Sequence, residues 1–214
     1  MSRQGRIWTS VIGGAALALA MALPAAAGEQ KPYRVRGTLE AVQGDQLKVK
    51  TREGPTLEAA LKDDSRILVV RPASLEQIKK GDYVGLTSID AGDKRVAIEA
   101  HIFADDLRGA SEGHVPWDLV KEPNTMTNAT VAEVEEVSGQ RELKVNYKQG
   151  EPKTEGSQTI YVPEDLAVVR LEKAPDRSVL AAGKAAFMVV RDEADGGRTA
   201  LAVIVGEDGA SPPM

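Results

Sequence analysis

The sequence predicts an all-β protein made of two small β-barrels in tandem, each with one short helix. Apolar and charged side chains alternate along several short segments, and glycine-containing turns separate these segments, as in strands with one buried face. The order of segments in the first half of the chain returns in the second half. Of the 214 residues, 42% are hydrophobic and 28% are charged, which argues against a chain that is disordered throughout.

Residues 1–27 have the pattern of a secretory signal peptide. Arg3 and Arg6 precede an uncharged run from Ile7 to Ala27, which ends in three alanines. A basic start, an apolar stretch and small residues at its end predict export with cleavage after Ala27. An uncleaved anchor is the alternative, but the strongly apolar part is shorter than the ~20 residues that span a bilayer. We therefore expect the protein in the periplasm.

The exported chain is acidic. Cleavage at this site removes two of the 27 basic residues and none of the 32 acidic ones, which leaves a net charge of −7. Proteins bind nucleic acids and anionic membranes mainly through lysine and arginine, so neither partner is expected. No later stretch is apolar enough to predict an integral membrane protein. The absence of cysteine excludes disulfides and thiolate metal sites.

The first two strands form a predicted hairpin at residues 33–42 and 47–51, joined by a glycine turn. In the second strand, a period of two places Leu47 and Val49 on a buried face and the lysines outside. Further strands are expected at residues 56–61, 66–70, 83–89 and 96–103.

One short helix is expected between these strands. Ser74 and Gln77 are spaced as a capping box, which marks a helix start. Leu75 and Ile78 then face inward, and Gly81 ends the turn.

The second half repeats this order, which indicates an internal duplication. The matching segments are residues 38–42 with 130–134, 47–49 with 143–145, 69–71 with 168–170, Gly81 with Gly183, and 95–98 with 198–201. The separation between matching residues rises from 92 to 103 along the chain. The second copy therefore has longer loops, and its residues 147–158 have the composition of an exposed hairpin tip.

Short antiparallel strands in a unit of about 80 residues favour a barrel over a flat sheet. Residues 37–42 read Gly-x-Leu-x-x-Val, and residues 47–49 read Leu-x-Val. This pattern resembles the small OB-like β-barrel domains of uncharacterised secreted bacterial proteins, although Ala129 replaces the glycine in the second copy. The resemblance implies two tandem OB-like barrels and an envelope setting, and it implies no activity.

We expect residues 28–106 to form the first OB-like barrel and residues 128–208 the second. Residues 107–127 are then a linker, and residues 209–214 a disordered tail. A barrel of this size buries only about 60% of the surface of its unfolded chain. The two barrels should therefore pack on each other as a fixed pair.

The linker contains Trp117, the only tryptophan of the exported chain. A plain linker is expected to avoid a large aromatic side chain, so Trp117 with Val115 and Leu119 is predicted to fill a groove between the barrels. Pro116 and Asp118 are expected at the same interface.

The alternative interpretation of the linker is a metal site. His114, together with His101 or Met126 and the carboxylates of Glu112 and Asp118, would bind copper or zinc. This set is similar to the sites of periplasmic copper carriers on OB-like barrels, where His and Met ligands lie beside a tryptophan. Those ligands are closely spaced on strands, whereas the methionines of this exported chain are widely separated. The interpretation of Trp117 as an interface residue is therefore preferred, and it implies no cofactor.

His101 belongs to a predicted strand at residues 96–103. Alternation places Glu99 and His101 on the same face, and the position that matches His101 in the second copy is Ile204. We therefore expect His101 to be a hydrogen-bonded packing residue at a contact of the first barrel, oriented by Glu99.

The sequence indicates no catalytic site. Ser111, His114 and Asp118 have the residue types of a catalytic triad, but no Gly-x-Ser-x-Gly motif surrounds a serine, so a triad is not expected. The preferred hypothesis is a non-enzymatic periplasmic binding or assembly module, whose partner is an envelope protein, a peptide or a glycan. A metal carrier and a hydrolase that uses His114 are the alternatives. The placement of the His101 and His114 rings distinguishes the three.

Overall fold

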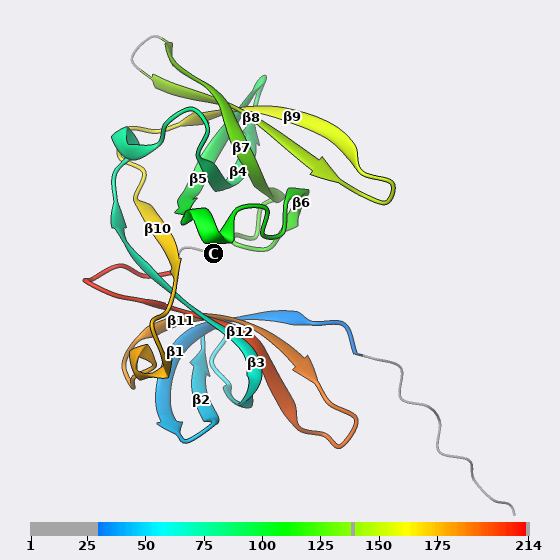
Figure 1. The fold of residues 1–214 in the computed structure, drawn as a ribbon, viewed down its shortest axis with the longest axis vertical. Helices are drawn as coiled ribbons and strands as arrows, with labels where there is room; N and C mark the ends of the chain where they lie inside the picture. The colour runs from blue at the N-terminus through cyan, green and yellow to red at the C-terminus, as the bar shows by residue number, and fades with distance from the viewer. Residues whose placement is uncertain (1–29, 138–139, 213–214) are drawn as a thin grey trace, which may run out of the picture.

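The computed structural model describes residues 30–137 and 140–212 (Figure 1), so the predicted signal peptide lies outside the described residues. The protein is all-β, as predicted. The helical elements of this part of the chain are three short 3-10 turns, and none of them is long and apolar enough to cross a membrane. The strands are β1 (Tyr33–Gln43), β2 (Gln46–Thr51), β3 (Thr56–Ala73), β4 (Tyr83–Ala91), β5 (Lys94–Phe103), β6 (Gly113–Trp117), β7 (Asn124–Val137), β8 (Gln140–Gln149), β9 (Thr154–Val162), β10 (Val168–Lys173), β11 (Ala185–Asp192) and β12 (Arg198–Gly206). The 3-10 turns are η1 (Leu75–Gln77), η2 (Asp105–Leu107) and η3 (Arg177–Val179).

Five strands close into a first barrel, at the bottom of Figure 1. β1 is antiparallel to both β2 and β11, β2 is antiparallel to β3, and β11 is antiparallel to β12. A parallel pairing of β12 with β3 completes the ring. Because each strand has a neighbour on both sides, closure removes the open sheet edges that invite aggregation.

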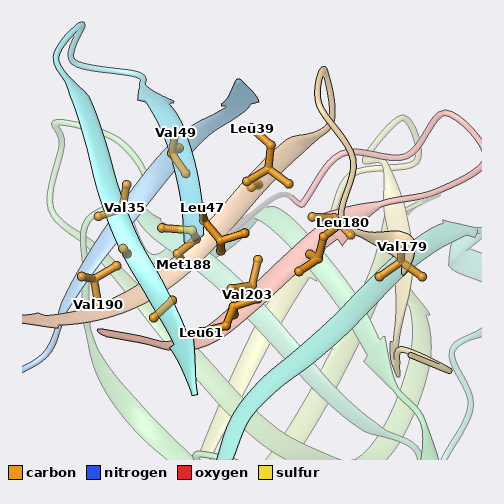
Figure 2. Packing of buried hydrophobic residues seen from close by; sticks show 14 of the residues in the cluster. Val35, Leu39, Leu47, Val49, Leu61, Val179, Leu180, Met188, Val190 and Val203 are labelled. Atoms are coloured by element: carbon orange, nitrogen blue, oxygen red, sulfur yellow. The ribbon is translucent and has the colours of Figure 1, made fainter. Parts of the chain in front are cut away.

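The core of this barrel follows the alternation of its strands. Leu39, Leu47 and Val49 are fully buried, and Met188 and Val203 from β11 and β12 pack against them (Figure 2). Leu47 and Val49 point inward, as the period of two predicts, whereas Lys48 and Lys50 on the same strand are exposed. The first barrel therefore buries residues from both ends of the chain in one core.

A second ring of pairings joins β4, β5, β7, β8 and β9. β4 lies between β5 and β7, and β8 lies between β7 and β9, all antiparallel. β5 and β9 meet at a single parallel pair, Val96 with Tyr161. This ring has its own core, which includes Val84, Leu86 and Leu143. After β9, β10 links the first barrel to the second ring. It pairs antiparallel with β3 of the first barrel and parallel with β5 of the second ring.

The strand pairings do not follow the expected division into residues 28–106 and 128–208. The β4–β5 hairpin belongs to the ring of β7, β8 and β9, and the β11–β12 hairpin belongs to the barrel of β1, β2 and β3. The physical reason is the length of β3, an unbroken strand of 18 residues. At about 3.3 Å per residue it spans roughly 60 Å, which carries the chain out of the first barrel before β4 begins. The first barrel and the second ring are therefore not two continuous segments in tandem.

The β4–β5 and β11–β12 hairpins, which each complete a ring formed by the other half of the chain, are anchored in the same way. The Gly81 N–H donates to the Val131 carbonyl at 2.9 Å, and the Gly183 N–H donates to the Leu39 carbonyl at 2.8 Å. Both glycines have positive φ values, 93° and 87°, which a side chain would strain. Glycine at these two positions therefore lets the chain turn from one barrel into the other.

The segment expected as a linker, residues 107–127, is an ordered part of the sheet. β6 lies within it and pairs antiparallel with β7 along its whole length. We call residues 107–123 the strap. The tail is also ordered at its start, because the Ala210 N–H donates to the Glu207 carbonyl at 2.9 Å and Ala210 packs against a core cluster between the barrels.

The short helices expected in each half are single 3-10 turns, η1 and η3. The predicted capping box of Ser74 and Gln77 is present at η1, and in it the Gln77 side-chain oxygen accepts the Ser74 N–H at 3.1 Å. In η3, the Asp176 carboxylate accepts the Ser178 N–H at 2.7 Å.

Candidate functional site

A row of three residues crosses the sheet of the second ring on the side that faces the first barrel. His101 of β5, Gly85 of β4 and Asn128 of β7 are register partners. A Cβ atom at Gly85 would lie 2.1 Å from Cε1 of His101 and 2.7 Å from Oδ1 of Asn128. The His101 ring and the Asn128 amide therefore lie directly over Gly85, where only glycine leaves room for them.

A chain of polar contacts continues from His101 along this face. Nδ1 of His101 is 2.6 Å from a carboxylate oxygen of Glu99, and the Thr87 hydroxyl donates to the other oxygen at 2.7 Å. The Thr87 hydroxyl is also 3.8 Å from the Met126 sulfur. All of these side chains are buried. We call Thr87, Glu99, His101 and Asn128 the polar cluster.

Three buried polar atoms of the described residues lie on this face without a hydrogen-bond partner: Nε2 of His101, Oδ1 of Asn128 and Nε1 of Trp117. A buried polar atom without a partner costs about 1–3 kcal/mol. Maintaining this polar surface between the barrels is therefore unfavourable for stability.

The first barrel presents apolar residues at three of the four matching positions. Its register pair Phe187 with Ile204 corresponds to Gly85 with His101, and its pair Val189 with Ala202 corresponds to Thr87 with Glu99. Phe187 and Ile204 are buried in the core between the barrels. The fold therefore accommodates apolar residues at the positions of Thr87, Glu99 and His101, whereas Asn128 corresponds to Arg36, the register partner of Phe187.

His114 has a different environment. Its Nδ1 is 2.8 Å from the Thr127 hydroxyl, its Nε2 is 3.2 Å from the Arg95 guanidinium, and its ring stacks on Tyr147 with centroids 5.9 Å apart. Because the guanidinium has only donors, Nε2 accepts and Nδ1 carries the proton. Burial, together with the positive charge of Arg95, lowers the pKa of His114 below its ordinary value.

This environment predicts a specific pH dependence of stability. The unfolded chain takes up a proton at the ordinary His pKa of 6.5, whereas folded His114 resists protonation, so its contribution is complete above that pH and falls as the pH drops below it. Between about pH 7.5 and about pH 5.5, the melting temperature should therefore fall more for the native protein than for His114→Gln. Asp118 is a matched control, because an Asp118→Asn change should leave the difference between these two pH values unaltered. A His114 pKa at or above 6.5 by NMR titration would contradict this assignment.

The two histidines lie on opposite faces of the same sheet. Thr127, which contacts His114, and Asn128, which lies beside the His101 ring, are consecutive residues of a regular strand and so point to opposite sides. Met126 shares the face of His101, but its sulfur lies at the Thr87 end of the polar cluster. His101, His114 and Met126 therefore do not converge.

The carboxylates expected in the metal interpretation are also engaged elsewhere. Glu112 accepts the Lys148 backbone N–H at 3.1 Å, and Asp118 is paired with Arg34 and Arg36 at 3.3 Å and 2.7 Å. Within residues 30–137 and 140–212, no group of three or more His, Cys, Asp or Glu side chains is arranged to hold a metal ion.

The structure places Trp117 between β6 and the first barrel. The Arg34 guanidinium lies 3.7 Å from the centre of the indole ring, and the Phe187 ring stacks on it at 6.4 Å. Trp117 is half-buried, Pro116 beside it is exposed, and Glu99 lies in the polar cluster. Trp117 therefore joins the strap to β1 and β11 of the first barrel.

Asp118 fixes the strap to β1, which carries both Arg34 and Arg36. Burial acts to raise the pKa of Asp118, but the hydrogen bond from Arg36 and the charges of Arg36 and Arg34 outweigh it and hold the pKa below its ordinary value. A third arginine, Arg52 of the β2–β3 turn, donates to the Leu119 carbonyl at 3.4 Å.

A groove of about 640 Å³ lies near the turn end of the β8–β9 hairpin, beside the strap. Sequence reasoning identified the long hairpin but missed this groove, because its walls come from the strap and from three strands. The lining residues are Glu112, Thr130, Asn146, Tyr147, Lys148, Glu155, Gly156 and Ser157. Most of them carry hydroxyl, amide or charged groups, and Lys148 is paired with Glu155 at 3.3 Å.

Comparisons with protein-family models, with curated proteins and with solved structures gave no match for this chain.

Proposed function

We propose that this chain is an exported, non-enzymatic binding or assembly module of the bacterial cell envelope, built from two OB-like barrels. The closed first barrel supports the OB-like assignment. Around the ring its strands run first, second, third, fifth, fourth, with the third and fifth parallel and a short helical turn before the fourth. This is the arrangement of a five-stranded Greek-key barrel.

The matching order of elements supports duplication as its origin. Each half contains a hairpin, a third strand, a 3-10 turn and a second hairpin, although the third strand of the second half is divided into β9 and β10. Both first hairpins have a register shift at the same place, after Leu39 and after Val131. The proposal that the protein is exported rests on the signal-peptide pattern of residues 1–27.

The groove at the β8–β9 hairpin carries the binding proposal. Next to it, residues 154–160 of β9 pair only with β8 among the strands that the structure describes, so one edge of β9 is open. An open edge offers backbone N–H and C=O groups to an extended peptide, and pockets beside it then select side chains. We propose an extended polypeptide segment of an envelope protein as the partner.

The exposed edge of β6 is less suited to this role. Pro116 has no N–H to offer, and the His114 N–H is already accepted by the Gln149 side chain at 2.9 Å. These two features favour the β9 edge. The groove also supports binding over catalysis, because Glu112 and Glu155 are each engaged by Lys148, through its backbone and its side chain.

Site-specific crosslinking tests this proposal. A photoreactive amino acid at Ser157, an exposed groove residue of β9, should yield a covalent adduct with an envelope polypeptide in the native host. The matched control is Thr56 of β3, also exposed, which pairs with Lys50 as Ser157 pairs with Asn146. No adduct at Ser157, or equal adducts at both positions, would refute a polypeptide partner at this groove.

A further inference from the structure

We infer that the two halves of this chain, residues 30–121 and 122–212, bind each other as the two subunits of a strand-exchanged dimer do, and that the covalent link between them is not needed for the fold. The inference concerns how the protein is assembled and does not depend on any ligand of the groove.

Neither half can close a ring from its own strands in this arrangement. The first barrel takes β1, β2 and β3 from one half and β11 and β12 from the other. The second ring takes β7, β8 and β9 from one half and β4 and β5 from the other. Without its partner, each half would therefore leave open the edges of its first three strands and of its second hairpin.

The contacts between the halves are reciprocal. Gly81 of the first half binds Val131 of the second, and Gly183 of the second half binds Leu39 of the first, at 2.9 Å and 2.8 Å. In a twofold dimer, if residue i of one subunit contacts residue j of the other, then residue j of the first subunit contacts residue i of the second. The two exchanges have this property although they occur within one chain.

The core between the barrels is shared in the same manner. One half supplies Val70, Tyr83 and Phe103, and the other supplies Phe187 and Ile204. These residues are 7% exposed or less, so separating the halves would expose two barrel cores and the surface between them. Only the strap crosses covalently from one half to the other, and residues 120–123 of the strap are exposed.

Cleavage of the strap in the full chain tests the inference. A recognition sequence for a site-specific protease is inserted between Lys121 and Glu122, and the uncut variant is the matched control. After cleavage, native mass spectrometry should show one complex of undiminished mass that re-forms after denaturation. Its melting temperature should now rise with protein concentration, because folding has become bimolecular, while that of the uncut variant stays constant.

Two results would overturn the inference. Pieces that separate and melt independently would show that each half closes its own barrel, and precipitation on cleavage would show that the link is required. If the insertion itself prevents folding, the same sequence between Glu122 and Pro123 provides the second variant. Crosslinking at Ser157 plays no part in these outcomes, so failure here and failure of the proposed function are distinguishable.

Discussion

Glu99→Ala is expected to cause the largest loss of stability among the changes considered. The substitution leaves buried His101 without its partner at 2.6 Å and the Thr87 hydroxyl without its acceptor. Leaving a buried hydrogen-bonding group without its partner costs about 1–3 kcal/mol, and this substitution leaves two such groups. For a chain of this size, the melting temperature should fall by roughly 10 °C or more, which differential scanning calorimetry measures directly.

The control is the double variant Glu99→Ala with His101→Ile, which copies Ala202 and Ile204, the two β12 residues of the first barrel that correspond to Glu99 and His101. Removing both partners of a buried polar pair and replacing them by apolar groups is often neutral or stabilising. The double variant should therefore melt within a few degrees of the native protein. A double variant as unstable as the single one would show that the polar cluster is structurally required.

If the double variant folds normally, the polar cluster becomes the best target for functional tests. Its unpaired atoms then carry a cost in stability that the fold does not demand. Loss of the Ser157 crosslink in a stable double variant would connect the polar cluster to the groove.

Trp117→Ala is expected to have the second largest effect. The change removes an indole that lies between the Arg34 guanidinium at 3.7 Å and the Phe187 ring at 6.4 Å. Truncation of a buried tryptophan costs about 3–5 kcal/mol, and because Trp117 is half-buried we expect about 3 kcal/mol. The free energy of unfolding in urea, followed by circular dichroism, measures this loss.

Trp117→Phe is the matched control. It retains an aromatic ring beneath Arg34 and removes the indole N–H, which is buried without a partner. The loss should therefore be much smaller, about 1 kcal/mol. Equal losses for the two variants would contradict a role of the ring in joining the strap to the first barrel.

Much of the local structure was predictable because alternation depends only on neighbouring residues. Leu47 and Val49 are buried between exposed lysines, as the period of two requires. Glu99 and His101 share a face for the same reason. The predicted strands at 56–61 and 66–70 are one strand, β3, with a bulge at residues 62–65, where the Ser65 hydroxyl accepts the Lys62 N–H at 2.8 Å.

The partners of the strands were not predictable from these patterns. Alternation indicates which face of a strand is buried, but it does not indicate which strand lies beside it. Two tandem barrels and the observed exchange satisfy the same pattern. The groove was missed for a related reason, because Glu112 of the strap meets Asn146 and Ser157 only after β7, β8 and β9 have paired.

The candidate metal set shows the same limit. His101, His114 and Met126 were grouped because their side chains are the right kind for a metal, whereas the sheet places the two histidines on opposite faces.

The sequence by itself determined the all-β class, the faces of the strands and the repeated order of elements, because each depends on interactions within a few residues. Only the tertiary structure decided that the first barrel and the second ring are each completed by a hairpin from the other half. That outcome follows from the unbroken length of β3, which brings β4 to β7, and from the burial of apolar surface that the pairing of distant strands makes possible.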